Sequence, residues 1–360
     1  MSSAIPSSAV PIPSTFSAEA YFSTQLPPPG LEAEVNGVRE FLHRQNAAGR
    51  KVVLVTSGGT TVPLELNVVR FLDNFSAGTR GATSAEYFLE AGYAVIFMHR
   101  QFSLQPFSRH YSHSTNPFLD FLEIETSTST SSSTSDFDSP SPTDSNTQLP
   151  VFEPDEEVPR ICVTASKRAD LLRVLTAYRA VQKAGTLHTV TFVTVNEYLW
   201  LLRAISHELA FSGRRAMYYL AAAVSDFFLP TQKMSEHKIQ SGKGSLVIEM
   251  DQVPKILKPM VDEWTPEGFI VSFKLETDPK LLVPKARQAL ERYGHQVVIG
   301  NDLHRRKFEV VFVSRPGDSG DIKESWLRLD EEEVKDGKEI EKDIISELVQ
   351  RHLAWIGVTI

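Results

Sequence analysis

The sequence lacks several features that mark common classes of protein. One cysteine, Cys162, in 360 residues excludes an intrachain disulfide and a cysteine-based zinc site, and it suits a reducing compartment. Lysine and arginine number 37 against 45 aspartates and glutamates, and this formal charge of −8 argues against bulk nucleic-acid binding. No apolar run reaches the length of about 18 residues that a membrane-spanning helix needs, so no membrane association is expected.

Motifs of familiar catalytic chemistry are also missing. No GxGxxG run follows a strand-like segment, and no Ser-His-Asp triad can be assembled from local motifs. His110 and His113 have HxxH spacing, but they lie in a Ser/Asn/Pro-rich stretch without a third ligand nearby. We therefore expect no metal site built from protein side chains.

Two stretches differ in composition from the rest of an otherwise ordinary globular sequence. Residues 1 to about 30 are rich in Ser and Pro and lack the basic residues of transit or secretory signals, which predicts a flexible arm. Residues from about 125 to 159 begin with an unbroken Ser/Thr run and continue with Asp, Ser and Pro. Such a composition predicts a disordered insertion within one domain that spans residues 31–360.

Short apolar runs alternate with helical patterns over the remaining chain. Strands are expected at 51–56, 93–98, 161–164, 189–194, 216–223, 246–250, 269–273, 297–299 and 308–313. Helices are expected at 79–91, 168–183, 197–210, 254–263 and 279–293, and an acidic C-terminal helix is expected around Ile340, Ile344, Ile345 and Leu348. This alternation predicts an α/β fold with a Rossmann-like, mostly parallel sheet covered by helices.

Ligands of such a sheet bind at the carboxyl ends of its strands, where two unusual segments occur. Residues 56–61 (TSGGTT) place paired glycines where backbone N–H groups can approach an anion, a plain tight turn being the alternative. Residues 70–81 open the next helix, where Ser76 or Thr79 can cap and the later glycines leave room for a phosphate. Asn74 suits holding a carboxyl group or an acyl intermediate, with an Asx turn as the alternative.

Two further segments follow later strands. Residues 221–227 (AAAVSDF) let a ligand lie against the backbone, and Asp226 can accept bonds from its amide or amine; an alanine-packed strand end with a capping Asp is the alternative. Lys238 lies in a basic, Gly-rich stretch (237–244) that resembles a lid over phosphates, although a surface lysine is usually just solvated. Phe273 can stack on a nucleotide base, and Asn301 can read its edge.

Taken together, these segments resemble the eukaryotic phosphopantothenate–cysteine ligases. The similarity is strongest in residues 55–60 and 69–86, continues in 221–227, 236–241 and 272–278, and extends from about residue 31 to the C-terminus. It implies a ligase that joins 4′-phosphopantothenate to L-cysteine through an acyl-nucleotide, giving 4′-phosphopantothenoyl-L-cysteine in coenzyme A biosynthesis. It also implies Mg²⁺ with ATP or CTP as cosubstrate, a homodimer, and a cytoplasmic location with the nucleus as alternative. Other enzymes of coenzyme A synthesis are further candidate partners.

The resemblance assigns roles residue by residue. Nucleotide binding is carried over to Gly58, Ser76, Gly78, Gly81, Phe273 and Asn301. The phosphopantothenate pocket is carried over to Asn74, Ala222, Ala223 and Asp226, with Arg70 reaching the substrate phosphate of the neighbouring subunit. Catalytic roles are carried over to Asn74, Lys238 and Asp226. The lid reads Lys-Ile-Gln-Ser here, in place of the Lys-Ile-Lys-Lys of bacterial relatives, so only its first lysine is carried over.

Two other functions compete with this interpretation. An NADP-dependent oxidoreductase would use Arg100 for the 2′-phosphate and the glycines for the pyrophosphate, but the missing GxGxxG run and the Asn74 segment argue against it. A non-catalytic scaffold of a coenzyme A synthesis complex would use the Ser/Thr-rich insertion and the acidic helix for docking or phosphorylation. The presence of every expected site residue argues against a purely scaffolding role.

Overall fold

A computed structural model of the chain describes residues 17–112, 118–125, 160–240, 244–315 and 321–357. The expected arm over residues 1–16, the expected insertion over 126–159, and His113 lie outside these ranges. The chain divides into two compact units, one within Met1–Arg109 and Ala180–Ile360 and the other within His110–Arg179. Each unit is described by itself. None of the helices in the described ranges is both long and apolar enough to cross a membrane.

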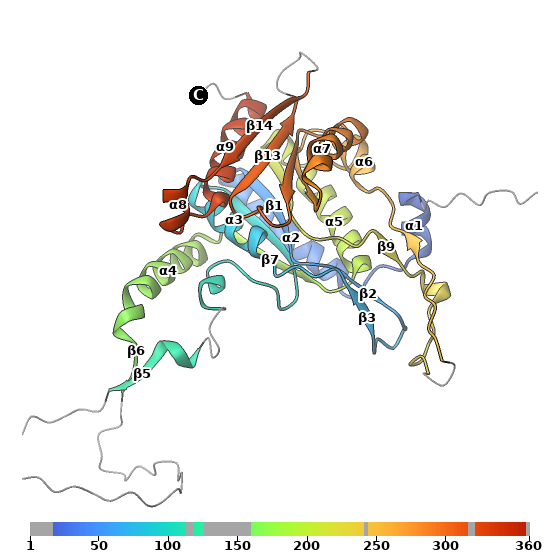
Figure 1. The fold of residues 1–360 in the computed structure, drawn as a ribbon, viewed down its shortest axis with the longest axis horizontal. Coiled ribbons are helices and arrows are strands. Elements are labelled where there is room, and N and C mark those ends of the chain that lie inside the picture. Colours follow the sequence, from blue (N-terminus) through green and yellow to red (C-terminus); the bar gives the residue numbers. More distant parts are fainter. Residues whose placement is uncertain (1–16, 113–117, 126–159, 241–243, 316–320, 358–360) are drawn as a thin grey trace, which may run out of the picture. The chain divides into compact units, whose positions relative to one another are not determined.

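The larger unit is built on an eight-stranded sheet with the order β14-β13-β12-β11-β8-β1-β4-β7 (Figure 1). Six neighbouring strands run parallel: β1 (Val52–Ser57), β4 (Ala94–Arg100), β7 (Leu187–Phe192), β8 (Ala216–Leu220), β11 (Phe269–Glu276) and β12 (Val297–Asp302). At one edge, β13 (Glu309–Ser314) and β14 (Lys323–Arg328) are antiparallel. The predicted mostly parallel sheet is confirmed. Both faces of β1 are buried, in keeping with the apolar run of its first four residues.

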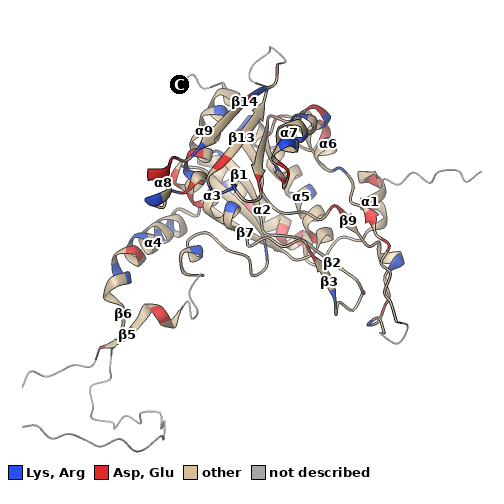
Figure 2. Ribbon diagram, in the orientation of Figure 1, with Lys and Arg blue, Asp and Glu red and all other residues tan. Residues whose placement is uncertain are grey.

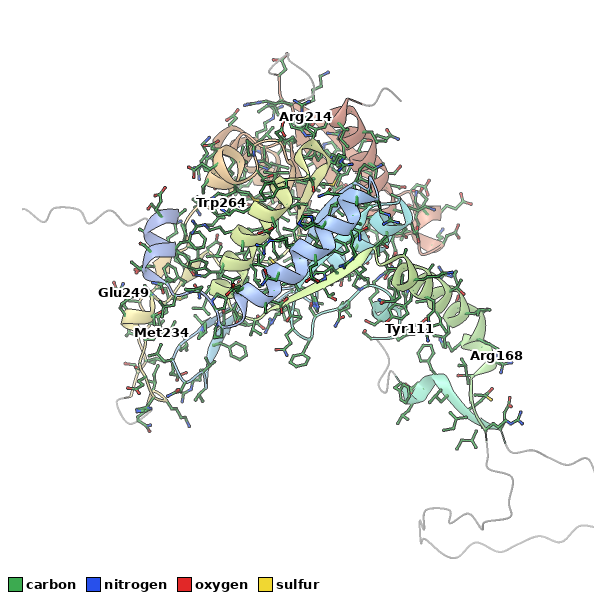
Figure 3. The ribbon with its side chains drawn as sticks, turned by 180° about the vertical axis from the view of Figure 1, so that it is seen from behind. Tyr111, Arg168, Arg214, Met234, Glu249 and Trp264 are labelled. Carbon is green, nitrogen blue, oxygen red and sulfur yellow. The ribbon has the colours of Figure 1, made fainter. Side chains whose placement is uncertain are left out.

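Helices cover both faces of this sheet. On one face lie α3 (Thr79–Glu90) and the predicted acidic helix, α9 (Ile340–Ile356). The short α8 (Glu331–Lys335), which begins with three glutamates, precedes α9 (Figure 2). On the other face, α2 (Leu31–Ala47) and α5 (Val195–Ala210) lie side by side (Figure 3), and α7 (Pro279–Tyr293) packs on β11, β12 and β13. The fold therefore has three layers, helix, sheet and helix, which enclose three clusters of buried apolar side chains, one on the α3–α9 face and two on the opposite face.

Smaller elements differ from their sequence predictions. A hairpin of β2 (Thr61–Pro63) and β3 (Phe71–Asp73) follows β1, and β9 (Phe227–Phe228) pairs with β10 (Asp251–Gln252). The predicted strand at 246–250 is wrong, since pairing begins only at β10. The predicted helix at 254–263 is replaced by α6 (Leu257–Pro259) and a π-helical turn (Met260–Trp264), because Pro259 cannot donate the backbone hydrogen bond of a regular helix.

The flexible arm predicted up to about residue 30 is wrong for its second half. Residues Ala18–Thr24 form α1, in which Tyr21 and Phe22 are buried. The Tyr21 hydroxyl donates to the Asn196 Oδ1 (3.0 Å), and the Phe22 ring makes an edge contact with the Trp200 ring. Two aromatic side chains within a Ser/Pro-rich stretch thus bury enough apolar surface to anchor this segment on α5.

The smaller unit contains the antiparallel pair β5 (Leu122–Glu125) and β6 (Arg160–Val163), followed by the start of α4 (Ala165–Ala184). The strand predicted at 161–164 is present as β6, but it pairs with β5 in a separate sheet instead of joining the parallel sheet. Alternation in the main sheet resumes only at β7, after α4.

Two buried histidines make the stability of the larger unit sensitive to acid. The His352 Nε2 lies 2.9 Å from the Arg214 carbonyl oxygen, and its Nδ1 lies 2.7 Å from the Tyr93 hydroxyl. The His295 Nε2 lies 2.7 Å from the Ser272 hydroxyl. Burial lowers the pKa of each ring to about 4, from an ordinary value of 6.5.

Between about pH 4 and pH 6.5, the two histidines bind protons in the unfolded chain but not in the folded chain. We predict that the free energy of unfolding falls by about 1.4 kcal/mol per pH unit and per histidine as the pH is lowered through this window. Denaturant titrations at about pH 7, 6 and 5 measure the slope. The His352→Gln substitution should reduce the slope by one histidine's share, while His43→Gln at an exposed position should not. An unchanged slope in His352→Gln would contradict this origin.

Candidate active site

The loops that follow β1 and β8 are hydrogen-bonded to each other at the carboxyl ends of the strands. The Thr60 N–H donates to the Ala223 carbonyl (3.0 Å), and the Ala223 N–H donates to the Gly58 carbonyl (2.8 Å). The Ala222 N–H donates to the Thr56 hydroxyl (3.2 Å). The structure therefore brings Gly58 next to Ala222 and Ala223, which lie more than 160 residues later in the sequence.

Asn74 directly follows the β2–β3 hairpin and lies beside the same loops. Its N–H donates to the Thr60 carbonyl (3.0 Å), and a Cβ on Gly59 would lie 1.8 Å from the Asn74 carbonyl oxygen. Only glycine permits this approach. The carboxamide of Asn74 is half-buried and makes no hydrogen bond within the described ranges, so it is available to a ligand.

The start of α3 lies beside β1 and β4. Gly78, in the left-handed region at φ 82°, is the N-cap of α3, whereas Ser76 or Thr79 was expected to cap. The Ser76 hydroxyl instead accepts a bond from the Gly78 N–H (3.3 Å). A Cβ on Gly81 would lie 2.4 Å from the Ser57 side chain. The absence of a side chain at residue 81 therefore serves close packing of α3 on β1, and does not by itself leave room for a phosphate.

Phe273 and Asn301 lie on neighbouring strands and on the sheet face that α3 covers. The Phe273 ring makes an edge contact with the Tyr219 ring (5.0 Å between centroids), and the Arg80 guanidinium lies 5.9 Å from its centroid. Asn301 is 7% exposed, and its Oδ1 has no hydrogen-bond partner in the described part of the chain. An unpaired buried oxygen of this kind is available to a ligand N–H.

The remaining predicted residues are Arg70 on the hairpin, Asp226 directly before β9, and Lys238 on the segment after β9. Asp226 and Lys238 are exposed. The Arg70 Nη1 donates to the Glu65 Oε1 (3.1 Å) and to the Ile239 carbonyl (3.0 Å), so Arg70 and the Lys238 segment are brought together. Sequence reasoning missed Glu65, because its partner Ile239 is distant in the chain and its only signal is an acidic residue inside an apolar run.

Arg100, the residue proposed for an NADP phosphate, is engaged elsewhere. Its Nη1 lies 2.5 Å from the Asp73 Oδ1 of the hairpin. This ion pair joins the end of β4 to β3. The guanidinium therefore holds the hairpin in place, and the geometry gives no support to a 2′-phosphate site.

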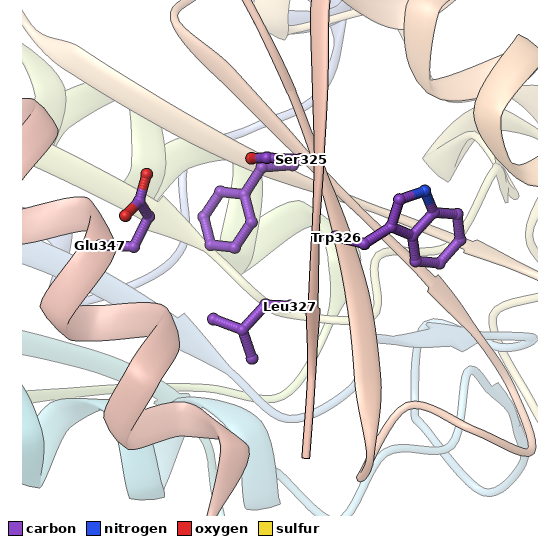
Figure 4. Close-up of a pocket in the computed structure, with 5 residues that line it drawn as sticks. Ser325, Trp326, Leu327 and Glu347 are labelled. Carbon is purple, nitrogen blue, oxygen red and sulfur yellow. The ribbon is translucent and has the colours of Figure 1, made fainter. Parts of the chain in front are cut away.

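A shallow pocket of about 170 Å³ lies away from all of these residues. It is formed by Phe312, Ser325, Trp326, Leu327 and Glu347, on β13, β14 and α9 (Figure 4). It includes no predicted site residue. The strand-end loops, and not this pocket, therefore form the candidate site.

Comparisons with known proteins find similar chains and a matching family. The family described as the DNA/pantothenate metabolism flavoprotein C-terminal domain matches residues 48–117 and 169–348. A human phosphopantothenate–cysteine ligase is 44% identical over 92% of this chain and 95% of its own length. The Saccharomyces cerevisiae phosphopantothenate–cysteine ligase CAB2 is 40% identical over 96% of this chain and 89% of its own.

A solved structure is also similar to this chain. A Cab2 mutant in complex with phosphopantothenate-cysteine superposes with a TM-score of 0.77 and 41% identity, covering 94% of this chain and 98% of that one. Sequence and structure match over most of both chains, which confirms the resemblance seen in the motifs. The chain belongs to the phosphopantothenate–cysteine ligase family.

Proposed function

We propose that this chain joins 4′-phosphopantothenate to L-cysteine in two steps at the strand-end loops. A carboxylate oxygen of phosphopantothenate attacks the α-phosphate of a nucleoside triphosphate, and pyrophosphate leaves. The cysteine amine then attacks the acyl carbon of the mixed anhydride, loses a proton, and displaces the nucleoside monophosphate. The single observation that carries this proposal is the bonding of the Gly58, Ala223 and Asn74 loops to one another through Thr60.

The nucleotide is proposed to lie over the start of α3. Gly58, Ser76, Gly78 and Gly81 surround that helix end, whose first N–H groups lack partners within the helix and favour phosphate. Phe273 and Asn301 are proposed to contact the base, which the unpaired Asn301 Oδ1 supports. The exposed ammonium of Lys238 is proposed to contact the transferring phosphates.

Phosphopantothenate is proposed to lie against Ala222 and Ala223, with Asp226 accepting hydrogen bonds from its amide groups. Asn74 is proposed to hold the acyl group, because its free carboxamide can donate to a carbonyl oxygen that becomes negative during attack. No covalent enzyme nucleophile is required. The residues would act by positioning two reactants and by stabilising developing charge.

The cosubstrate is proposed to be a Mg²⁺ complex of ATP or CTP, because phosphate oxygens are ligands that Mg²⁺ prefers. The cation would neutralise phosphate charge as the α-phosphate is attacked. The single cysteine suits a cytoplasmic location.

A homodimer is proposed with the β2–β3 hairpin at its interface. Large apolar side chains are exposed on and beside this hairpin: Leu66, Val68, Val69, Phe71, Leu72 and Phe75. A run of exposed apolar residues is typical of an interaction surface. Arg70, between them, is proposed to reach the substrate phosphate of the neighbouring subunit with the Nε and Nη2 that Glu65 leaves unbound.

The Asn74→Asp substitution should separate the two steps. It is nearly isosteric, but it places a negative charge where an oxyanion develops, so cysteine capture should slow by about 10²–10³-fold while activation persists. Mass spectrometry should find the acyl-nucleotide bound to the variant, whereas the wild type and the exposed control Asn36→Asp should release product and nucleoside monophosphate.

The same assay tests the function itself. If the wild type forms no phosphopantothenoylcysteine with either triphosphate, the ligase proposal fails and a scaffold is favoured. If activation and capture fall equally in Asn74→Asp, this residue has another role.

A mixing experiment tests whether Arg70 acts across the dimer. The Arg70→Ala and Asp226→Ala homodimers should each be nearly inactive, because every site lacks one group. After co-expression about half of the dimers are mixed, and one site in each has both groups, so about a quarter of the wild-type activity should return. Activity that stays near zero would place Arg70 in its own subunit's site, and an active monomer by light scattering would exclude the dimer.

A further inference from the structure

Glu65 is a fully buried carboxylate at the junction of the β2–β3 hairpin and the segment that carries Lys238. Its Oε2 accepts a bond from the Arg70 N–H (2.9 Å), and its Oε1 accepts from the Arg70 Nη1 (3.1 Å) and the Ile239 N–H (3.3 Å). Both oxygens are therefore used, and each donor comes from a residue beside or within the proposed binding machinery.

The charge of this carboxylate is retained despite its burial. Burial alone would raise the pKa of Glu65, but N–H bonds from Arg70, Ile239 and Val69 and the Arg70 charge hold it below its ordinary value. The group is thus an ionised acceptor at neutral pH. Removing the charge would leave these donors with a weaker partner.

Backbone pairing extends the same junction. The Leu66 N–H donates to the Ser235 carbonyl (2.9 Å), and the Asn67 N–H donates to the Glu236 carbonyl (3.2 Å). The Arg70 Nη1 also donates to the Ile239 carbonyl, directly after Lys238. Residues 235–239 consequently lie along the hairpin: Glu65 is bridged to Ser235 through its backbone, and its carboxylate reaches Ile239, the residue after Lys238.

Only one nitrogen of the Arg70 guanidinium, Nη1, is hydrogen-bonded to the Glu65 carboxylate. Its Nη1 and backbone N–H are engaged, whereas its Nε and Nη2 have no partner among the described residues, and its side chain is 39% exposed. The anchored edge fixes the direction of the free edge. A planar guanidinium held in this way is oriented before it meets an anion.

We infer that Glu65 is a positioning residue that orients Arg70 and Lys238 together, so that the substrate phosphate and the nucleotide phosphates are bound by one rigid unit. This inference rests on the proposed function, in which Arg70 and Lys238 contact different ligands. Its consequence is specific: one buried residue that touches neither ligand controls the affinity for both.

The Glu65→Gln substitution keeps the side-chain length but removes the charge and one acceptor. We predict that the KM values for phosphopantothenate and for the nucleotide both rise by about tenfold, with a smaller change in kcat. Glu65→Asp restores the charge and should recover part of both losses.

The control is Glu86→Gln. Glu86 is also buried, and it accepts bonds from the Arg109 guanidinium and from the Phe107 N–H. This variant also loses a buried carboxylate paired with an arginine and should be destabilised, but both KM values should stay within about twofold of the wild type.

Hydrogen exchange provides a readout that does not depend on turnover. The amides of residues 235–240 should exchange about tenfold faster or more in Glu65→Gln than in Glu86→Gln. If Glu65→Gln does not fold, Arg70→Ala tests the same link without turnover. Exchange in 235–240 should accelerate, and the dissociation constant for the nucleotide, measured by calorimetry, should rise although Arg70 is proposed to contact only phosphopantothenate.

Failure of the positioning role can be distinguished from failure of the proposed function. If the wild type makes no product, the proposed function fails, and the exchange measurement still tests the junction. If the wild type is active but both KM values are unchanged in Glu65→Gln, or if only the folded fraction falls, the positioning role is wrong. A rise in one KM alone would also overturn it.

Discussion

Thr60 makes three hydrogen bonds on which the rest of the site depends. Its N–H donates to the Ala223 carbonyl, its carbonyl accepts from the Asn74 N–H, and its hydroxyl accepts from the Ser225 N–H (2.9 Å). A single residue of the loop after β1, Thr60, thus fixes the loop after β8 and the end of the hairpin. Gly59 makes this possible, because any side chain there would collide with the Asn74 backbone.

This arrangement suits a reaction that needs positioning more than a reactive side chain. The proposed nucleotide residues lie around α3, and the proposed phosphopantothenate residues lie on the loops bonded to Thr60. An acyl carbon beside Asn74 would be adjacent to both groups. The inferred role of Glu65 follows the same principle, since it would orient two cationic side chains, Arg70 and Lys238, without contacting either ligand.

Much of the fold could be predicted, because β1, β4 and β8 are buried on both faces and appear as short apolar runs. The strand-end rule then predicts the loops at Gly58 and Ala222 as ligand sites, whereas Phe273 lies within β11 itself. The edge strand β14 was missed because its side chains are mostly exposed and polar. Helix α1 was missed because two anchoring aromatic residues lie in a Ser/Pro-rich stretch. Glu65 was missed because its partner Ile239 is 174 residues away.

One site is proposed to form an acyl-nucleotide and then to pass the acyl group to cysteine. The most direct test supplies phosphopantothenate labelled with ¹⁸O in its carboxyl group, with cysteine, Mg²⁺ and the triphosphate. Because the carboxylate oxygen that attacks the α-phosphate stays on phosphorus when cysteine displaces it, the released nucleoside monophosphate should carry one ¹⁸O atom. Product formation with the label in inorganic phosphate or pyrophosphate, or with an unlabelled nucleotide, would contradict the acyl-nucleotide route.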